Sequence, residues 1–263
     1  MAPGADFRVS SGRIHAEDAM PAFSARHALT RSDAEFVVRC LTRSGREAAE
    51  VEARLRDEGI DALLDDPQLL GVILDTPQGA HASLPLFTYL VVRSALRRAG
   101  EEDRALADMV AGTVLEFAIR DRAYRVSEVD DEIYVALTDL LHDVDTADVK
   151  RNFLVRLHLG NYALWLSGLF PDHIEHRRWR RGGPNLEYYE ELGSRGYRMA
   201  SSHRIAEEHG LSALLTRAAD RFGTLRLALN AVSDRLLFPG LQSPERLLRQ
   251  VRGETLRAWG MVN

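Results

Sequence analysis

The sequence is short of two residue types, cysteine and lysine. Because Cys40 is the only cysteine, the chain cannot form an internal disulfide, and zinc sites built from cysteine pairs are excluded. Lys150 is the only lysine among the 34 basic residues, an arginine bias that fits a GC-rich bacterial genome. Cys40 lies on the apolar side of 36–41, so we expect a small core residue rather than a reactive thiol.

Long apolar runs are scarce as well. Residues 1–11 lack the apolar core of a signal peptide. The most apolar stretch, 153–170, is interrupted by three polar residues, and its uninterrupted part is shorter than the roughly 20 apolar residues that cross a bilayer. We therefore expect a cytoplasmic protein in which this stretch belongs to a buried central helix over about 146–170.

Neither sign of charge dominates the chain. The net charge is −5, with 28% charged and 45% hydrophobic residues, which is ordinary for a soluble globular protein. A protein of this charge has no overall attraction to nucleic acid or to anionic lipid. With 263 residues the chain can bury about three quarters of its unfolded surface, enough for one large domain or two small ones.

Strand signals are missing, and helical patterns take their place. No long stretch alternates with a period of two residues, and no hairpin signal joins two strands. A repeat of about 20 to 50 residues, which would indicate a solenoid, is absent too. We predict an all-α fold, a bundle of about nine to eleven helices in one domain over 31–263. Residues 1–30 are predicted to form a poorly ordered or draping arm, and 31–75 is a candidate small helical subdomain.

Capping residues and helix breakers mark the predicted helix ends. Ser32 and Glu35 fit a capping box that begins the first helix, and Gly59 is expected to end the second. Thr146 is the expected cap of the central helix. Pro171 ends or kinks that helix, because proline cannot continue one.

Glycines inside predicted helices indicate close packing. Gly160 lies in the central helix, and Gly193 and Gly196 lie in a later helix whose stripe runs from Tyr188 to His203. Glycine costs about 1 kcal/mol relative to alanine in a helix, so its use there calls for a reason. We expect these glycines to allow neighbouring helices to approach closely, with Gly160 against another helix backbone.

The nearest approach to a catalytic motif is the stretch 140–145, at the end of a helix predicted over about 129–142. It is similar to the His-Asp dyad of HD-domain phosphohydrolases, which are also all-α. The resemblance implies that His142 and Asp143 hold one divalent metal, which activates water against a phosphate. The resemblance covers about six residues. The family also uses an upstream histidine and a distant aspartate; His81, the nearest upstream histidine, is far away in the sequence, and no aspartate can be assigned. The alternative is a polar helix end, with His142 at the negative end of the helix dipole.

A second candidate metal site uses His173, His176, His203 and Glu207. The two members of each pair, His173 with His176 and His203 with Glu207, are spaced to share a helix face. If the two faces met, they would hold zinc or iron. The alternative is an ordinary surface with His203 buried alone, because the Glu-x-x-His pattern of di-iron bundles is absent.

A basic cluster follows directly. It consists of Arg177, Arg178, Trp179, Arg180 and Arg181. Arginines around an aromatic ring can bind phosphates and stack on bases, so one interpretation is phosphate or nucleic-acid recognition. The same residues after an apolar helix would also suit an anionic membrane surface. The third interpretation is a solvated turn whose arginines pair with Glu187, Glu190 and Glu191.

Polar residues in apolar segments form the last candidate set. They are Glu116, Arg156, His158, Asn161, Arg226, Asn230 and Asp234. An unpaired buried charge costs several kcal/mol, so we expect these residues to pair across helices. We hypothesise that Arg156 pairs with Glu116 or Asp234. The set is either a structural network or the lining of a polar ligand pocket.

No glycine-rich phosphate loop and no nucleophile elbow occurs, and neither catalytic residues nor a cofactor can be assigned. We therefore predict a bacterial cytoplasmic protein-interaction or regulatory module whose partner is a protein. The alternative is a metal-dependent hydrolase or oxidase, with its site at His142 and Asp143 or at the His173, His176 and His203 group. Phosphate or nucleic-acid recognition through 177–181 is the third hypothesis, and the oligomeric state stays open.

Overall fold

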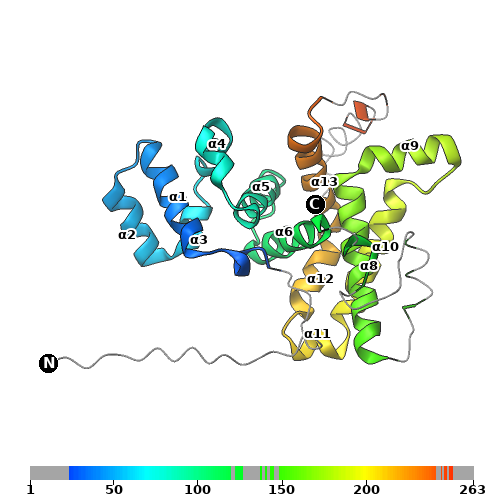
Figure 1. Cartoon of the computed structure of the whole chain (residues 1–263). Helices are drawn as coiled ribbons and strands as arrows, with labels where there is room; N and C mark the ends of the chain where they lie inside the picture. Colours follow the sequence, from blue (N-terminus) through cyan, green and yellow to red (C-terminus); the bar gives the residue numbers. More distant parts are fainter. Residues whose placement is uncertain are drawn as a thin grey trace.

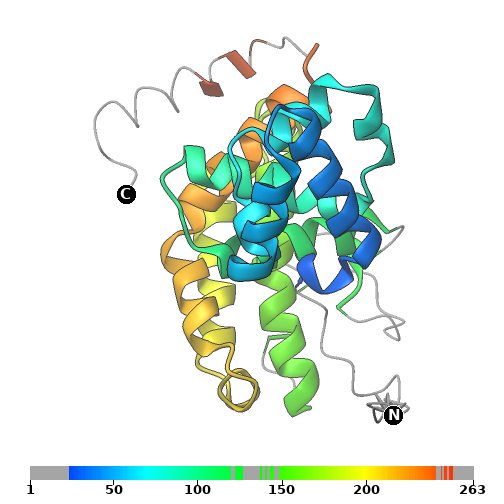
Figure 2. The ribbon, with the colours of Figure 1, turned by 90° about the vertical axis from the view of Figure 1, so that its left-hand side faces the viewer.

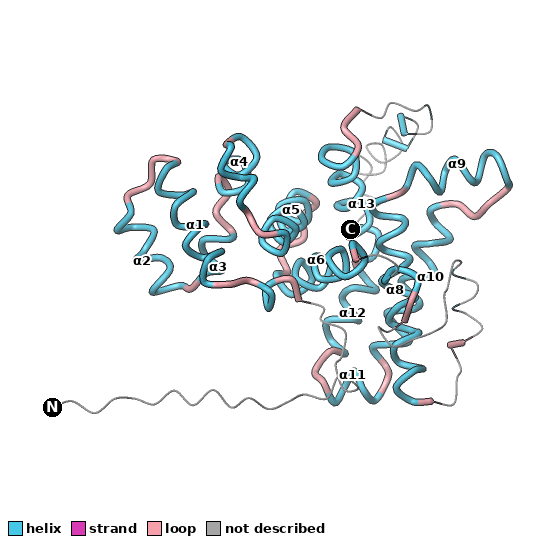
Figure 3. The backbone as a smooth tube through the Cα atoms, in the orientation of Figure 1, coloured by secondary structure: helices cyan, strands magenta, loops and turns pink. Residues whose placement is uncertain are grey.

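The computed structural model describes residues 24–119, 122–126, 137, 140, 143–144, 148–240, 244, 246–247 and 249–250. Twelve α-helices occur in these residues, ten of them with seven residues or more. No strand occurs in the described part of the chain (Figures 1 and 3). The predicted all-α class is therefore confirmed.

Four helices near the N-terminus form a group on one side of the molecule, which we call the N-terminal layer (Figure 1). Figure 2 views the molecule from that side, with these blue and cyan helices in front of the green and yellow ones. The four helices are α1 (Arg31–Arg43), α2 (Ala48–Glu58), α3 (Ile60–Leu64) and α4 (Leu69–Asp75). Gly59, at a φ of 79°, ends α2 as predicted.

The cap of α1 corrects the sequence prediction by two residues. Thr30, not Ser32, is the N-cap, and its side chain accepts a hydrogen bond from the backbone N–H of Asp33. The Asp33 carboxylate accepts in return from the Thr30 backbone N–H at 2.7 Å. Thr30 and Asp33 have the same spacing as Ser32 and Glu35, so the spacing alone does not decide between the two boxes. Residues 24–30 drape over the bundle, and Ala25 is fully buried.

Two consecutive helices that pack against each other connect the N-terminal layer to the rest of the bundle. They are α5 (Leu84–Arg98) and α6 (Arg104–Ala118). Ser83 caps α5 by accepting from the Leu86 backbone N–H at 3.3 Å. Asp103 caps α6 and accepts from two backbone N–H groups.

The remaining helices surround α8 (Val149–Leu169), the predicted central helix. Its cap is Asp148 rather than Thr146, which lies outside the described residues. Most of its side chains are buried, on every face. No described helix has the length and apolar composition of a bilayer span. The elements that follow are α9 (Pro171–Arg181), α10 (Leu186–Ser201), α11 (Arg204–Glu208), α12 (Ser212–Asp220), α13 (Phe222–Val232) and the π-helical turn η5 (Ser233–Leu237).

Glycines set the distance between α8 and α10, as predicted. A Cβ atom at Gly196 would lie 2.7 Å from the backbone nitrogen of Gly160, closer than real Cβ atoms approach. A Cβ atom at Gly160 would lie 2.4 Å from the ring of Tyr197. One at Gly193 would meet the ring of Phe222 at 2.2 Å. The backbone contact is therefore made at Gly196, while Gly160 also makes room for a tyrosine ring.

Candidate functional site

Helix α9 is defined at both ends by its sequence. Pro171 stands at the first helical position, where its missing N–H costs nothing, and Asp172 adds negative charge to the first turn. Basic residues occupy the last turn, at the negative end of the dipole. Gly182 ends the helix in the left-handed conformation, at a φ of 66°. The helix projects beyond the end of the bundle (Figure 1).

The two sides of α9 differ in kind. Ile174 and Glu175 are buried against the bundle. The opposite side carries five basic or titratable side chains at helical spacing, and they line a hollow of about 380 Å³. We call these residues the α9 basic face; they are His173, His176, Arg177, Arg180 and Arg181. All five are exposed.

The charges of this face are not neutralised within the described part of the protein. Arg178, on the flank, lies 3.8 Å from Glu175. The predicted pairing with downstream glutamates does not occur for Glu190, which binds Arg226 at 2.9 Å instead. Arg177, Arg180 and Arg181 have no ion pair with any described carboxylate, Glu187 and Glu191 included. The face therefore presents to the solvent three guanidinium groups that no described carboxylate neutralises.

Trp179 accompanies these arginines on an adjoining side of α9. It is 62% exposed, the largest such fraction among the described bulky hydrophobic residues. The guanidinium of Arg178 lies 5.9 Å from its ring centre, within cation–π distance. Tryptophan and arginine are the residue types that most often dominate binding at protein interfaces. Their combination on one exposed helix is therefore a candidate docking surface.

The pKa of His173 reports the positive field of the face. Partial desolvation lowers this pKa below its ordinary value of 6.5, and the charges of Arg177, His176 and Arg181 lower it further. The imidazole is consequently neutral at neutral pH. A bound anion would stabilise its protonated form and raise the pKa again.

The structure does not bring the predicted metal ligands together. His173 and His176 follow the C-terminal end of α8, whereas the ring of His203 lies 5.4 Å from that of Phe153, near its N-terminal end. From Phe153 to the end of α8 is about 24 Å, at 1.5 Å per residue. His203 instead caps α11 by accepting from the Ile205 N–H at 3.2 Å. The prediction that these two pairs, His173 with His176 and His203 with Glu207, form one metal site is therefore wrong.

The remaining predicted ligands are also dispersed. Glu207 is exposed on α11. Asp143 is half-buried and binds Arg151 at 3.2 Å. His142 lies outside the described residues, so the His-Asp dyad stays a prediction. Across the described residues, no group of three or more histidine, cysteine, aspartate or glutamate side chains is placed to hold a metal ion.

Part of the buried polar set forms a structural network. Arg226 donates to Glu190 on α10 at 2.9 Å and to Asn230 at 3.2 Å. Asn230 in turn donates from its amide nitrogen to the backbone oxygens of Ser167 and Gly168, each at 2.8 Å. These bonds join α13 to α10 and to the last turn of α8. The network interpretation therefore holds for these two residues.

Two polar side chains of the central helix, Asn161 and His158, form hydrogen bonds with neighbouring elements. Asn161 accepts from the hydroxyl of Tyr197 at 2.9 Å, with both groups buried. Nε2 of His158 lies 3.1 Å from the backbone oxygen of Ala123. The His158 ring also stacks on Tyr162, at 6.0 Å between centres. These contacts link α8 to α10 and to 122–126.

Of the two carboxylates predicted to pair with Arg156, Asp234 is bound by other residues instead. Arg156 is half-buried and donates from Nε to the backbone oxygen of Val144 at 3.4 Å. Asp234 is bound by other arginines, at 2.7 Å by Arg249 and at 3.4 Å by Arg246. Pairing of Arg156 with the half-buried Glu116 stays a prediction.

The two arginines that bind Asp234 were not identified from the sequence. Asp172, the other carboxylate that these arginines bind, was not identified either. Arg246 and Arg249 also bind Asp172, at 2.9 and 3.0 Å. Burial opposes ionisation of Asp234, but hydrogen bonds from Arg249 and Gln250 outweigh it and lower its pKa. Asp172 stands beside proline and histidine in an exposed-looking sequence, so its pattern offers no signal of burial.

Comparison of the chain with family models, with curated proteins and with solved structures finds no match. The geometry of the protein's own residues is therefore the basis for the functional argument that follows.

Proposed function

We propose that the protein is a regulatory binding module that docks an acidic segment of a partner protein on the α9 basic face. One observation supports this above the others. Arg177, Arg180 and Arg181 share an exposed helix face and are not neutralised by any described carboxylate. A guanidinium group keeps its charge at all ordinary pH values and offers five donors, so it is suited to binding carboxylates.

The size of the face favours a protein segment over an extended nucleic acid. The stretch from His173 to Arg181 covers about 12 Å of helix, at 1.5 Å per residue. Such a length contacts few phosphates, and the net charge of −5 repels a polyanion elsewhere on the surface. A short acidic peptide engages the face without approaching the rest of the protein. Trp179 supplies the apolar contact that a partner protein can cover.

The test is a matched pair of charge-reversal variants. One variant combines Arg177→Glu, Arg180→Glu and Arg181→Glu. The control combines Arg39→Glu, Arg43→Glu and Arg56→Glu, which change the net charge equally at three exposed arginines of the N-terminal layer. Binding of a fluorescein-labelled oligoglutamate peptide is measured by fluorescence polarisation. We expect the first variant to weaken binding at least about tenfold and the control to leave it within about twofold.

Two outcomes would contradict the proposal. Equal weakening by both variants would show that net charge, not the α9 basic face, drives binding. Tighter binding of single-stranded DNA or of anionic vesicles than of the peptide, lost only in the α9 variant, would assign the face to another class of partner.

The proposal includes a reducing, bacterial cytoplasm as the compartment. Cys40 is buried in the core, and burial raises the pKa of its thiol. Such a thiol is protected from oxidation, and the arginine bias of the composition supports a bacterial source. Mass spectrometry of the purified protein checks this, with an unmodified Cys40 as the expected result.

A further inference from the structure

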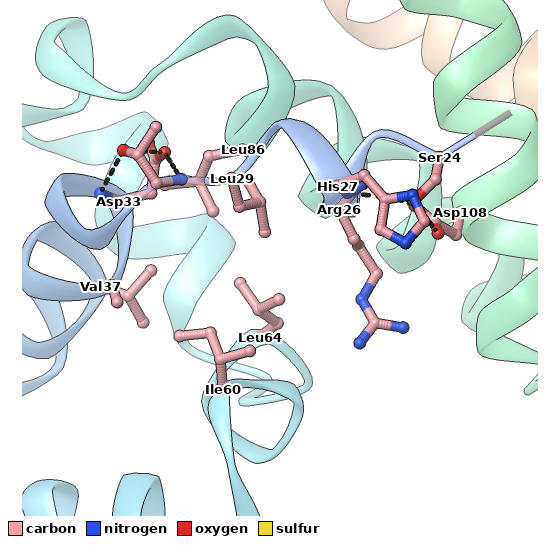
Figure 4. Close-up of a pocket in the computed structure, with 12 residues that line it drawn as sticks. Ser24, Arg26, His27, Leu29, Asp33, Val37, Ile60, Leu64, Leu86 and Asp108 are labelled. Carbon is pink, nitrogen blue, oxygen red and sulfur yellow. Dashed lines mark hydrogen bonds between the residues drawn. The ribbon is translucent and has the colours of Figure 1, made fainter. Parts of the chain in front are cut away.

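A second site lies far from α9, between the N-terminal layer and helices α5 and α6. There the protein forms a cavity, open on one side, of about 320 Å³, at the lower end of the range of about 300–1,000 Å³ for ligand pockets. Its walls come from 24–30, α1, α3, α5 and α6 (Figure 4). Ligand sites are frequent at such junctions between structural units.

The floor of the cavity is aliphatic. Five side chains from four segments converge there, as Figure 4 shows, and they are Leu29, Val37, Ile60, Leu64 and Leu86. Ala34, beside them on α1, is small and half-buried. A floor of this kind accepts an alkyl chain, since each methylene group removed from water contributes about 0.8 kcal/mol.

Two carboxylates lie at the edge of this floor, and their described partners are all uncharged. Asp33 is 6% exposed and accepts from the N–H and the hydroxyl of Thr30, at 2.7 and 2.8 Å. Asp108 accepts from the hydroxyl of Ser24 at 2.6 Å and from the backbone N–H of Arg26 at 2.8 Å. A carboxylate has about four acceptor positions, so Asp108 retains capacity for a further donor, whereas Asp33 also accepts from the side chain of Ser83.

The one guanidinium group on the wall does not offset these charges. Arg26 forms an ion pair with Asp61, which lies outside the cavity lining. Its Nε has no acceptor among the described residues, but that atom is enclosed by protein and cannot reach a ligand. Subtracting the Arg26–Asp61 pair leaves the cavity with an excess of negative charge beside an apolar floor.

We propose that this cavity binds an aliphatic amine, with its alkyl chain on the leucine-rich floor and its ammonium group on Asp108. An alkylammonium ion stays protonated at neutral pH, as the lysine side chain does. It offers three donors, and Asp108 can accept from them at the positions that Ser24 and Arg26 leave free. The inference is independent of the α9 basic face, since no residue is shared.

Three ligands of equal chain length separate the contributions of chain and charge. Hexylamine, hexan-1-ol and hexanoate are titrated against the full chain, and binding is measured by saturation-transfer NMR. We expect hexylamine to bind at least about tenfold more tightly than either of the others. Asp108→Asn keeps an acceptor for the Arg26 backbone N–H and supplies a donor to the Ser24 hydroxyl oxygen while removing the charge, and it should abolish this preference. Asp57→Asn, at an exposed position of α2, is the matched control.

A filling variant locates the site. Ala34→Leu places a larger side chain in the cavity without replacing a carboxylate, and it should reduce hexylamine binding at least about tenfold. Equal affinity for hexan-1-ol and hexylamine would overturn the proposal, as would tightest binding of hexanoate or no binding of any of the three. If Asp108→Asn fails to fold, comparison of the three ligands on the unaltered protein still decides the question.

Discussion

Helices α8 and α10 approach each other through glycines, whereas the junction of the N-terminal layer with α5 and α6 adds partly buried ion pairs to its apolar contacts. A Cβ at Gly196 would lie 2.7 Å from the backbone of Gly160. At the other interface, Asp65 accepts from Arg93 at 2.8 Å and from Arg104 at 2.7 Å. Close packing does not depend on the solvent, but ion pairs respond to pH and salt. The two interfaces should therefore fail under different conditions.

Breaking the charged interface should have the largest effect. The Arg93 side chain is only 4% exposed, and Asp65→Asn would leave its buried charge with Glu102 alone. We expect the free energy of unfolding to fall by about 3–5 kcal/mol in urea titrations. Asp57→Asn, on the exposed side of α2, should change it by less than about 0.5 kcal/mol. A loss below about 1 kcal/mol for Asp65→Asn would show that apolar contacts alone hold this interface.

Overfilling the glycine contact should rank next. Gly196→Leu places a side chain against the Gly160 backbone, which cannot move aside, and should lower the free energy of unfolding by about 1–3 kcal/mol. Gly71→Leu is the matched control, because a Cβ at Gly71 in α4 meets nothing within 4 Å. That variant should be neutral or stabilising, since leucine favours the helix. Equal destabilisation by both changes would refute the close-approach argument.

Removing the amide that joins α13 to α8 should cost less. Asn230→Ala leaves the backbone oxygens of Ser167 and Gly168 without their donor, for an expected loss of about 1–2 kcal/mol. Thermal unfolding followed by circular dichroism measures it. The effect should be independent of salt, in contrast to that of Asp65→Asn, and a strong salt dependence would place Asn230 in an electrostatic network instead.

Acid should loosen the N-terminal layer before it affects α8, and this should be the weakest of the four effects. Burial opposes ionisation of Asp65, but hydrogen bonds from Arg93 and Arg104 lower its pKa below 3.8. A lowered folded pKa means that the stabilisation is present above pH 3.8 and is lost as the pH falls through the folded value. Hydrogen exchange near pH 3 should show slightly faster exchange in α3 than at pH 6, after correction for intrinsic rates. Faster exchange in α8 instead would contradict the comparison.

Helix positions followed from local chemistry and were largely predictable. Pro171, Ser83 and Gly59 each act within one turn of their own position, so their effects can be read without knowing the fold. The cap of α1 was misplaced because Thr30 and Ser32 begin boxes of equal spacing. Tertiary contacts decide between such alternatives, and these are not visible in a short window of sequence.

Site residues were harder to place, because pairing across helices depends on three-dimensional distance. Asn230 was expected to find a partner, since an amide in an apolar helix must do so, and it donates to the backbone of α8. His173 and His203 were grouped by residue type and local spacing, yet α8 separates them by its length. The cavity beside Asp108 gave no sequence signal at all, because its walls come from segments far apart in the chain.

The last turn of α8 has a consequence for how α9 meets a partner. Its final three backbone oxygens, those of Ser167, Gly168 and Leu169, accept hydrogen bonds from the side chains of Asn230 and Ser233. The chain turns into α9 immediately afterwards, at Pro171. A corner held in this way fixes the direction of α9 before any partner arrives. Association then loses little conformational entropy at the helix itself, and the ordering of the incoming segment becomes the main entropic cost.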